Sequence, residues 1–542
     1  MCGWLGRPDP IEAAGHGDEA PGIVGPLGLT PDAEAGMSAA ESAALEHAAD
    51  IAGVTRSLVE EDPPMSAHEV RRLAVKGIGA VLVRTFTLRA ITFAGNIILA
   101  RILDPKSFGL FAIVNFVVLI SAFLAGMGIG AALVQRKQRL TEDDLRTAFT
   151  LGFIVDGVIT IALVLLAPVL VAAYNLEPQY ANAVRVMALT IMVSALAIVP
   201  AIQMERNLRF KEMANADLVA QLVYVATAVG LAVGGLHVSA FVIASVISRS
   251  LHTIIVNIIS PWKPALGIVR ERLRAMLAFG VPYQLNGLVL QLKDNFVPTF
   301  IAVVAGAEAV GYINWAVGLA TNALFLLTIV SRVTFPAYAR LQHDLPALKD
   351  SVEKSIKWIS ATVFPAVFML AALAHQIVRF LYGPKWAPGL ISFYLLCIPM
   401  IASSYSTVLV SALHGVGRAK TVLKLTTIWA IAGWAIAVPM TLWIGYNGFA
   451  LAMAFVSMLS VLSVIEMNKV VKISFVRDQI KIAIIAGVPA FAVWVMSYQV
   501  VHGIPSLLGL AAFGGLSYVG LMALTGEIRE ARALVKGSLQ RA

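Results

Sequence analysis

The segment ILDPKSFGLF, Ile102–Phe111, has a counterpart about two hundred residues later in VAGAEAVGYI, Val304–Ile313. Each segment has the pattern of a helix end, a short turn and the start of a new helix. Gly109 and Gly311 stand at the same place in the two segments. We therefore expect two halves of the chain to share one architecture.

The residues around these segments form long apolar blocks. The chain of 542 residues is 58% hydrophobic and only 13% charged, about half the charged fraction of an ordinary soluble protein. The blocks are roughly 20 residues long, which is the length that crosses the hydrocarbon core of a bilayer. The sequence thus predicts an all-α polytopic membrane protein with about fourteen transmembrane helices. Their expected centres are Leu88, Leu119, Thr160, Val193, Ala226, Ser248, Val289, Phe325, Val367, Met400, Ile431, Ser457, Pro489 and Gly515.

A second repeated pair extends the internal symmetry. GLHVSAFVIASV, from Gly235, matches GYNGFALAMAFV, from Gly445. One period holds six expected spans, and an even number preserves topology, so the repeat predicts two six-helix lobes related in parallel about an axis along the membrane normal. The expected domains are an N-terminal lobe at residues 75–262, a C-terminal lobe at 270–470, two additional transmembrane helices at 476–526 and a cytoplasmic tail at 527–542.

Residues 1–70 form a separate acidic segment. They hold thirteen acidic and two basic side chains and are rich in alanine, glycine and proline. A segment of this composition cannot bury enough apolar surface to fold, so we expect a disordered cytoplasmic tail. Met37 and Met65 are alternative starts, and they leave open whether residues 1–64 are translated.

The basic residues predict the orientation. Six loops on one side of the expected spans carry 23 lysines and arginines, at residues 136–146, 206–211, 263–274, 332–357, 418–424 and 469–481. The opposite loops carry Arg101, Lys106 and Lys385. Because basic loops remain in the cytoplasm, we expect the basic side and both termini to face the cytoplasm, with the chain in a bacterial inner membrane.

Two motifs carry a resemblance to a known family. ILARILDPKSFGLFAIV, Ile98–Val114, is followed by GMGIGAALVQR, Gly126–Arg136. This pattern resembles the Wzx-type polysaccharide transporters, which are lipid-linked oligosaccharide flippases of the multidrug/oligosaccharidyl-lipid/polysaccharide exporter superfamily. The resemblance covers roughly residues 75–470. It implies two bundles around a central cleft lined by the first and seventh helices, and export of a polyprenyl-pyrophosphate-linked oligosaccharide for exopolysaccharide or lipopolysaccharide O-antigen.

A polar face on the first expected helix marks a candidate substrate site. Thr85, Arg89, Thr92 and Asn96 recur at helical spacing and so share one face. Arg89 lies near the middle of the span, where an arginine costs at least about 2.5–3.5 kcal/mol, so we expect it to face a cleft or a buried ion pair rather than lipid. Arg84, near the cytoplasmic end, either joins this site or snorkels to the interface.

The seventh expected helix carries a polar face at the matching depth. The repeat aligns Gln291 with Arg89 and Asp294 with Thr92, and Lys293 lies beside them. We therefore add Gln291 and Lys293 to the candidate substrate contacts. An alternative is that Lys293 and Asp294 neutralise each other or partners within the bundle.

Three acidic or basic residues in other helices complete the candidates. Arg249, near the middle of the sixth expected helix, is either a second phosphate contact or the partner of Asp156 in the third helix. Asp156 and Asp294 are the candidates for carrying a coupling proton or sodium ion. Asp217 lies near the cytoplasmic end of the fifth helix, which favours a solvated or capping role.

These features predict a flippase that works by alternating access of two lobes around a cationic cleft. Arginine suits a pyrophosphate because its planar fork donates paired hydrogen bonds. The expected partners are the lipid-linked oligosaccharide, membrane lipid and a proton or sodium ion, with a polymerase and glycosyltransferases of the same pathway as further candidates. We expect no enzymatic activity, catalytic residue, metal, cofactor or nucleic-acid partner.

Two other functions remain as alternatives. A multidrug or cation antiporter of the same superfamily would call for exposed carboxylates in the cleft, where this sequence places an arginine. A membrane-embedded glycan polymerase or glycosyltransferase would call for acidic motifs in its outer loops, and those loops hold no carboxylate pair for acid–base chemistry.

The predicted orientation can be tested with single cysteines in a background that lacks Cys2 and Cys397. Cysteines at positions 175 and 236 should react with an impermeant thiol reagent added to intact cells. Cysteines at positions 138 and 208 should react only after the cells are opened. Labelling of the second pair in intact cells would show that the orientation is reversed.

Overall fold

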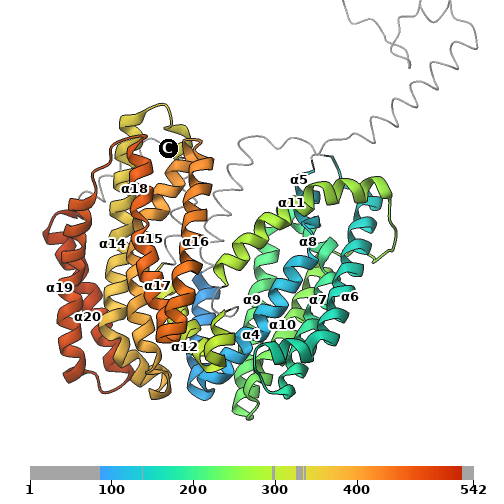
Figure 1. Cartoon of the computed structure of the whole chain (residues 1–542), viewed down its shortest axis with the longest axis horizontal. Helices are drawn as coiled ribbons and strands as arrows, with labels where there is room; N and C mark the ends of the chain where they lie inside the picture. Colours follow the sequence, from blue (N-terminus) through green and yellow to red (C-terminus); the bar gives the residue numbers. More distant parts are fainter. Residues whose placement is uncertain (1–85, 137, 296–299, 325–333, 335–336, 528–542) are drawn as a thin grey trace, which may run out of the picture. The chain divides into compact units, whose positions relative to one another are not determined.

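The computed structural model describes residues 86–527, apart from residue 137 and residues 296–299, 325–333 and 335–336. The secondary-structure elements that these residues form are helices (Figure 1), which confirms the expectation of an all-α protein. We use the name N-terminal bundle for the helix at residues 86–102 together with α4 (Pro105–Ala125), α5 (Ile129–Gln135), α6 (Glu142–Ala173), α7 (Ala181–Ala195), α8 (Ile198–Arg206), α9 (Phe210–Val233) and α10 (His237–Ile259).

The second half of the chain contributes a further set of helices. After α11 (Arg270–Asp294), the C-terminal bundle comprises α12 (Ala302–Asn322), α14 (Leu345–Ile377) with its continuation η3 (Val378–Tyr382), η4 (Pro384–Trp386), α15 (Gly389–Gly415), α16 (Ala419–Ile444), α17 (Tyr446–Met458) and α18 (Val461–Asn468). The chain then adds α19 (Val476–Val500) and α20 (Ile504–Leu524). The expected lobe boundaries at residues 262 and 270 stay a prediction.

Eleven of the described helices are long and apolar enough to cross a membrane, and the number is twelve if α7 and α8, which meet at 51°, form one broken span. The chain is thus a multi-pass membrane protein, but the expected count of about fourteen is not confirmed. The helix at residues 86–102 falls short of a full span in its described part. Helix α11 is a second expected span that is not counted, because it carries four charged residues in its first turn and a half. The span expected around Phe325 is centred outside the described residues.

The two repeated segments pack against each other. Asp104 caps α4 by accepting a hydrogen bond from the Ser107 amide at 3.1 Å, and Pro105 occupies the first turn, so the chain turns sharply into α4. The most extensive contact between two described helices joins α4 to α12. At its centre, a Cβ atom on Gly109 would overlap the carbonyl oxygen of Ala307, and one on Gly311 would overlap that of Pro105. The two backbones therefore touch at the repeated glycines, as small residues allow in membrane helices.

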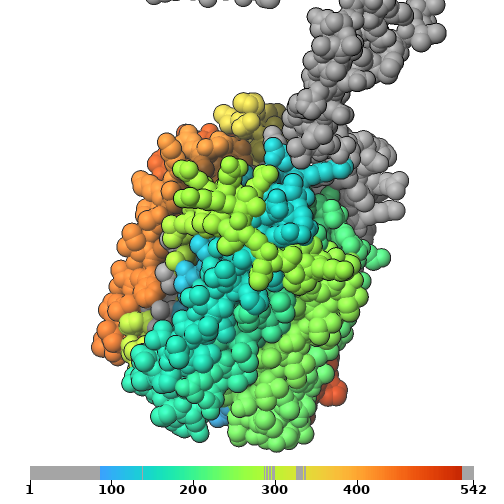
Figure 2. Space-filling view, turned by 90° about the vertical axis from the view of Figure 1, so that its right-hand side faces the viewer, coloured from blue at the N-terminus to red at the C-terminus, as the bar shows by residue number. Residues whose placement is uncertain are grey.

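Helix α11 is attached to the N-terminal bundle, where it contacts α4, α5 and α6. A Cβ atom on Gly280 would overlap the carbonyl oxygen of Met127, in the turn after α4 where Gly128 has a φ of +66°. The Gln284 amide donates to the carbonyl oxygen of Phe123. Figure 2 shows α11 at the surface of this bundle, beside the cyan residues of α5.

The connection that precedes α11 is held to the same bundle. The amides of Gly267 and Val269 donate to the hydroxyls of Thr150 and Thr147, at 2.9 and 3.1 Å. Arg272 Nε lies 3.4 Å from the carboxylate of Asp144, which is fully buried. The residues between the two halves of the chain are thus anchored on the start of α6.

The added helices α19 and α20 pack on α14 through two small apolar clusters. A buried carboxylate joins their ends. Glu527, only 4% exposed, accepts hydrogen bonds from Lys481 of α19 and lies 2.7 Å from Nζ of Lys357 in α14. Burial by itself raises the pKa of Glu527, but the hydrogen bonds and charges of the two lysines outweigh it and hold the pKa below the ordinary value of 4.5.

The glycine contact predicts an unusual response to alanine. Alanine in a helix is normally more favourable than glycine by about 1 kcal/mol. Gly230→Ala should follow that rule, because a Cβ atom there meets nothing within 4 Å. Gly311→Ala should instead lower the Tm of the detergent-solubilised protein, since overpacking costs about 1–3 kcal/mol. An equal or higher Tm for Gly311→Ala would contradict the backbone contact.

The Glu527 cluster predicts a pH-dependent contribution to stability. Glu527→Gln should lower the free energy of unfolding by about 1.5–3 kcal/mol at pH 7, the range for hydrogen bonds to charged groups. Because the folded pKa is lowered, this contribution is present above pH 4.5 and is lost as the pH falls through the folded pKa. Thermal unfolding at pH 7 and at successively lower pH below 4.5 checks this, with the exposed Asp350→Asn as a control that should change little. A difference between wild type and Glu527→Gln that does not shrink as the pH is lowered below 4.5 would contradict it.

Candidate functional site

A cavity lies where the two bundles meet. It has a volume of about 610 Å³ and is lined by residues of the helix at 86–102, α4, α9, α10, α12 and η3. We call it the interface cavity. Its polar lining residues are Arg89, Thr92, Asn96, Asn115, Tyr224, Asn314, Thr321, Asn322 and Tyr382.

The polar face expected on the first helix lines this cavity. Arg89, Thr92 and Asn96 all contribute to its wall. The hydroxyl of Thr92 donates to the Leu88 carbonyl at 2.8 Å and accepts from the side-chain amide of Gln221 on α9 at 3.1 Å. The helical spacing of the three residues thus directs their side chains into one space, as the sequence predicts. The other two candidates on this helix, Arg84 and Thr85, lie outside the described residues.

Helix α12 also contributes to the wall of this cavity, through Asn314, Thr321 and Asn322. None of these three residues, nor Asn115 in the middle of the apolar helix α4, is among the sites predicted from the sequence. A signal for them exists, because uncharged amides at membrane depth are costly unless they face a partner or a water-filled space.

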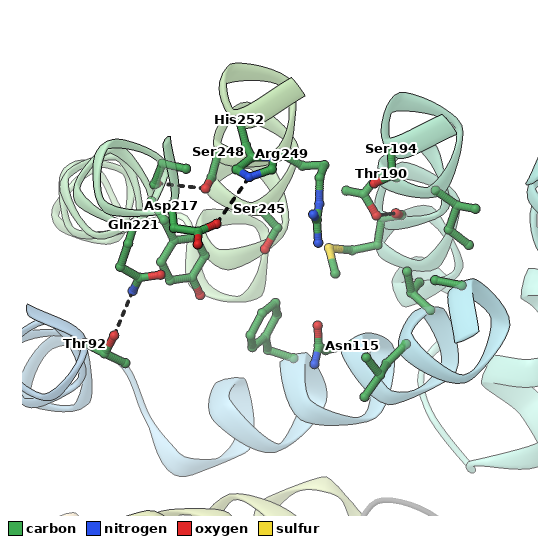
Figure 3. Close-up of a pocket in the computed structure, with 18 of the residues that line it drawn as sticks. Thr92, Asn115, Thr190, Ser194, Asp217, Gln221, Ser245, Ser248, Arg249 and His252 are labelled. Atoms are coloured by element: carbon green, nitrogen blue, oxygen red, sulfur yellow. Dashed lines mark hydrogen bonds and ion pairs between the residues drawn. The ribbon is translucent and has the colours of Figure 1, made fainter. Parts of the chain in front are cut away.

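A second cavity of about 560 Å³ lies wholly within the N-terminal bundle, among the helix at 86–102, α4, α7, α9 and α10. We call it the N-bundle cavity. Figure 3 shows the guanidinium of Arg249 extending from α10 into this space and the carboxamide of Asn115 facing it from α4. In the part of the chain that the structure describes, neither side chain has a hydrogen bond or ion pair. Both are therefore available to a ligand.

Asp217 and His252 contact each other on the wall of the N-bundle cavity. His252 Nε2 lies 3.2 Å from Asp217 Oδ1 and links α10 to α9. The sequence favours a solvated or capping role for Asp217, whereas in the structure its carboxylate contacts the imidazole of His252. His252 follows Arg249 by three residues on α10, so the pair stands beside the guanidinium. The carboxylate of Asp217 is the only one among the described residues that line the two cavities.

The expected alternative partner of Arg249 is located elsewhere. Asp156 is 6% exposed within α6 and lines neither cavity. One turn along α6, the Thr160 hydroxyl donates to the Ala188 carbonyl of α7, which places this face of α6 against α7. Among the described residues, no ion pair joins Arg249 to Asp156.

Of the candidates on the seventh expected helix, the structure describes the side chain of Gln291 alone. Gln291 lies in α11 and lines neither of them. The side chains of Lys293 and Asp294 lie outside the described part of the chain. A substrate contact by Gln291 or Lys293, and an ion-carrying role for Asp294 or Asp156, stay predictions.

The two cavities adjoin, because Leu88, Thr92, Phe111, Asn115 and Tyr224 line both. Arg89 lines one cavity and Arg249 the other. Between them lie amide and hydroxyl groups, which can bind either phosphate oxygens or sugar hydroxyls. The charges on the described lining residues are two arginines and the Asp217–His252 pair, so the combined space favours an anion. Among the described residues, no group of three histidine, cysteine or acidic side chains could hold a metal ion.

Two relatives of this chain, WzxC and ExoT, are named for the biosynthesis or transport of a polysaccharide. An uncharacterized membrane protein in the cps region of Klebsiella pneumoniae is 24% identical over 68% of this chain and 76% of its own length. Lipopolysaccharide biosynthesis protein WzxC of Escherichia coli K12 is 23% identical over 61% of this chain and 67% of its own length. Succinoglycan biosynthesis transport protein ExoT of Rhizobium meliloti is 23% identical over 64% of this chain and 70% of its own length.

Solved structures share the fold. Lipid II flippase MurJ in an inward closed conformation superposes with a TM-score of 0.69 at 14% identity, over 82% of this chain and 98% of that chain. A multidrug resistance MATE family transporter in an inward-facing conformation superposes with a TM-score of 0.53 at 15% identity, over 73% of this chain and 94% of that chain. The family model for "Polysaccharide biosynthesis protein" matches residues 98–391, which is more than half of the chain. The chain belongs to this polysaccharide biosynthesis protein family.

Proposed function

We propose that the protein is a flippase that carries a polyprenyl-pyrophosphate-linked oligosaccharide across the bacterial cytoplasmic membrane for exopolysaccharide or lipopolysaccharide O-antigen synthesis. The observation that carries this proposal is the pair of adjoining cavities, with Arg89 in one and, in the other, Arg249, which pairs with no described residue. A transporter of an anionic headgroup needs cationic, water-accessible groups inside its helices, and these cavities supply them.

The chemistry of the lining matches the parts of such a substrate. A pyrophosphate offers several oxyanions, to which guanidinium groups donate strong, charge-assisted hydrogen bonds. Arg249 and Asn115 face each other across the N-bundle cavity and would bind phosphate oxygens. The amides of Asn314 and Asn322 in the interface cavity would bind sugar hydroxyls. The polyprenyl chain would stay in lipid, because its transfer from hydrocarbon into a water-accessible cavity is unfavourable.

The mechanism that we propose is alternating access. The two bundles would rock against each other about the α4–α12 contact and expose the cavities to one side of the membrane at a time. The basic loops support an orientation with both termini in the cytoplasm. A proton or sodium ion is the candidate driving ion, with Asp156 or Asp294 as its carrier, since one charge crossing 100 mV supplies about 2.3 kcal/mol. A polymerase and glycosyltransferases of the same pathway are candidate partners.

The relatives favour a transporter over the enzyme alternative, because ExoT is named as a transport protein and MurJ as a flippase. The lining charges favour an anionic cargo over the cationic drugs of a multidrug antiporter. A cationic drug would meet two arginines and one carboxylate that is already paired with His252. The lipid-linked saccharide that accumulates when the gene is deleted would separate the three functions.

The two arginines provide the test. Arg89→Ala and Arg249→Ala should each slow export at least tenfold, because a hydrogen bond to a charged group contributes about 1.5–3 kcal/mol. Arg89→Lys and Arg249→Lys should retain part of the activity, since lysine keeps the charge but not the paired donors. The measurement is the amount of lipid-linked oligosaccharide retained on the cytoplasmic side, normalised to the protein in the membrane.

Arg146→Ala is the matched control. Arg146 lies outside both cavities in an exposed pair with Glu142, so its loss should leave export unchanged. Normal export by the Arg89→Ala, Arg249→Ala double variant would exclude headgroup binding at these cavities. A protein that fails to accumulate when Arg89 alone is replaced would favour a buried structural ion pair for Arg89.

A further inference from the structure

The helix at residues 86–102 ends with backbone carbonyls that its own turns cannot satisfy. The Leu99 carbonyl accepts from the Leu103 amide at 2.7 Å. The next two carbonyls are satisfied by the other bundle. Trp386 Nε1 donates to the Ala100 carbonyl at 2.9 Å, and Lys385 Nζ donates to the Arg101 carbonyl at 3.0 Å. Two donors from η4 therefore cap the end of a helix in the N-terminal bundle.

The same relation holds in the opposite direction. Helix α14 continues through η3 and ends before Gly383, whose φ is +98°. Arg101 Nη1 donates to the carbonyls of Phe380 and Leu381 in that last turn. Lys385, next to the end of η3, thus caps the helix at residues 86–102, and Arg101, at the end of that helix, caps η3. The positive charge of each side chain also interacts favourably with the negative end of the helix dipole that it caps.

Aromatic rings seal the space beside these caps. Trp386 is fully buried and its ring centroid lies 5.2 Å from that of Phe108 in the N-terminal bundle and 5.8 Å from that of Trp315 in α12. Phe108, Trp315, Tyr382 and Ala100 also line the interface cavity. The capped helix ends and their aromatic cluster therefore form one wall of that cavity, at the end that bears Arg101 and Lys385 rather than the basic loops.

We infer that Arg101, Lys385 and Trp386 form the outer gate of the transport path, a latch in which two helix ends cap each other across the bundles. The inference rests on the proposed function for the cargo that passes, but the latch itself follows from the contacts. Parting the bundles here strands no polar group, because water on the outer side can replace every cap. The gate can therefore open without leaving a polar group buried and unpaired.

The test measures the gate directly. A single cysteine at Gly318, which lines the interface cavity and has open space for a side chain, is placed in a background without Cys2 and Cys397. Its reaction with an impermeant thiol reagent is followed in intact cells that make no lipid-linked saccharide. The double variant Arg101→Met, Lys385→Met should raise the labelling rate about tenfold, the shift expected from the loss of the paired caps. Trp386→Phe, which keeps a ring but loses the N–H, should raise it less.

Lys106→Met is the matched control, because Lys106 is a lysine of the same side whose partner, Glu177 at 3.1 Å, lies within the N-terminal bundle. It should leave labelling unchanged. The inference is overturned if the double variant, at normal membrane abundance, labels like wild type, or if Lys106→Met raises labelling equally. If Trp386→Phe does not accumulate, the labelling rate of the Arg101→Met, Lys385→Met variant is sufficient to test the inference. If the labelling changes as expected but the protein moves no lipid-linked saccharide, the latch is supported and the proposed cargo is excluded.

Discussion

The backbone contact of α4 with α12 at Gly109 and Gly311 is the constraint on which the rest of the site depends. Only the absence of side chains lets the two helices approach this closely. Their approach brings Phe108 of one helix and Trp315 of the other into the same aromatic cluster around Trp386. It also sets the helix at residues 86–102, which precedes α4 by two residues, against η3 and η4. The interface cavity and its latch are both consequences of this crossing.

The cost of polar groups in a bilayer explains how the remaining residues are arranged. Large apolar side chains such as Ile431 of α16 and Leu516 of α20 are exposed on the outside, whereas Arg89, Arg249 and Asn115 line cavities between helices. Arg249 is paired with no described residue, yet it faces a cavity of about 560 Å³ rather than lipid. A cavity of this size can hold water, and hydration reduces the cost of the charge. The same arrangement makes the guanidinium accessible to an anion.

Parts of this structure could be predicted from the sequence because they depend on spacing within one element. The repeat places Gly109 and Gly311 in register, and the helical period places Arg89, Thr92 and Asn96 on one face. Contacts between distant elements could not be predicted in the same way. The repeat aligns α11 with the first helix, but it does not encode the contact of Gly280 with the turn after α4. The Asp217–His252 pair joins two helices whose relative rotation no periodicity determines, and the mutual caps depend on an irregular turn at η3.

The mutual capping of the two helix ends has a thermodynamic consequence for direction. Every bond that the latch loses on opening can be remade with water, so the closed form is favoured only by the small net energy of the caps, on the order of the tenfold shift expected from their loss. A carrier with such a gate stores no free energy in its closed form that could drive cargo outward. Its net flux then follows the difference in cargo concentration across the membrane and any ion that accompanies the cargo. Removal of the cargo on the outer side would be sufficient to make transport effectively one-way.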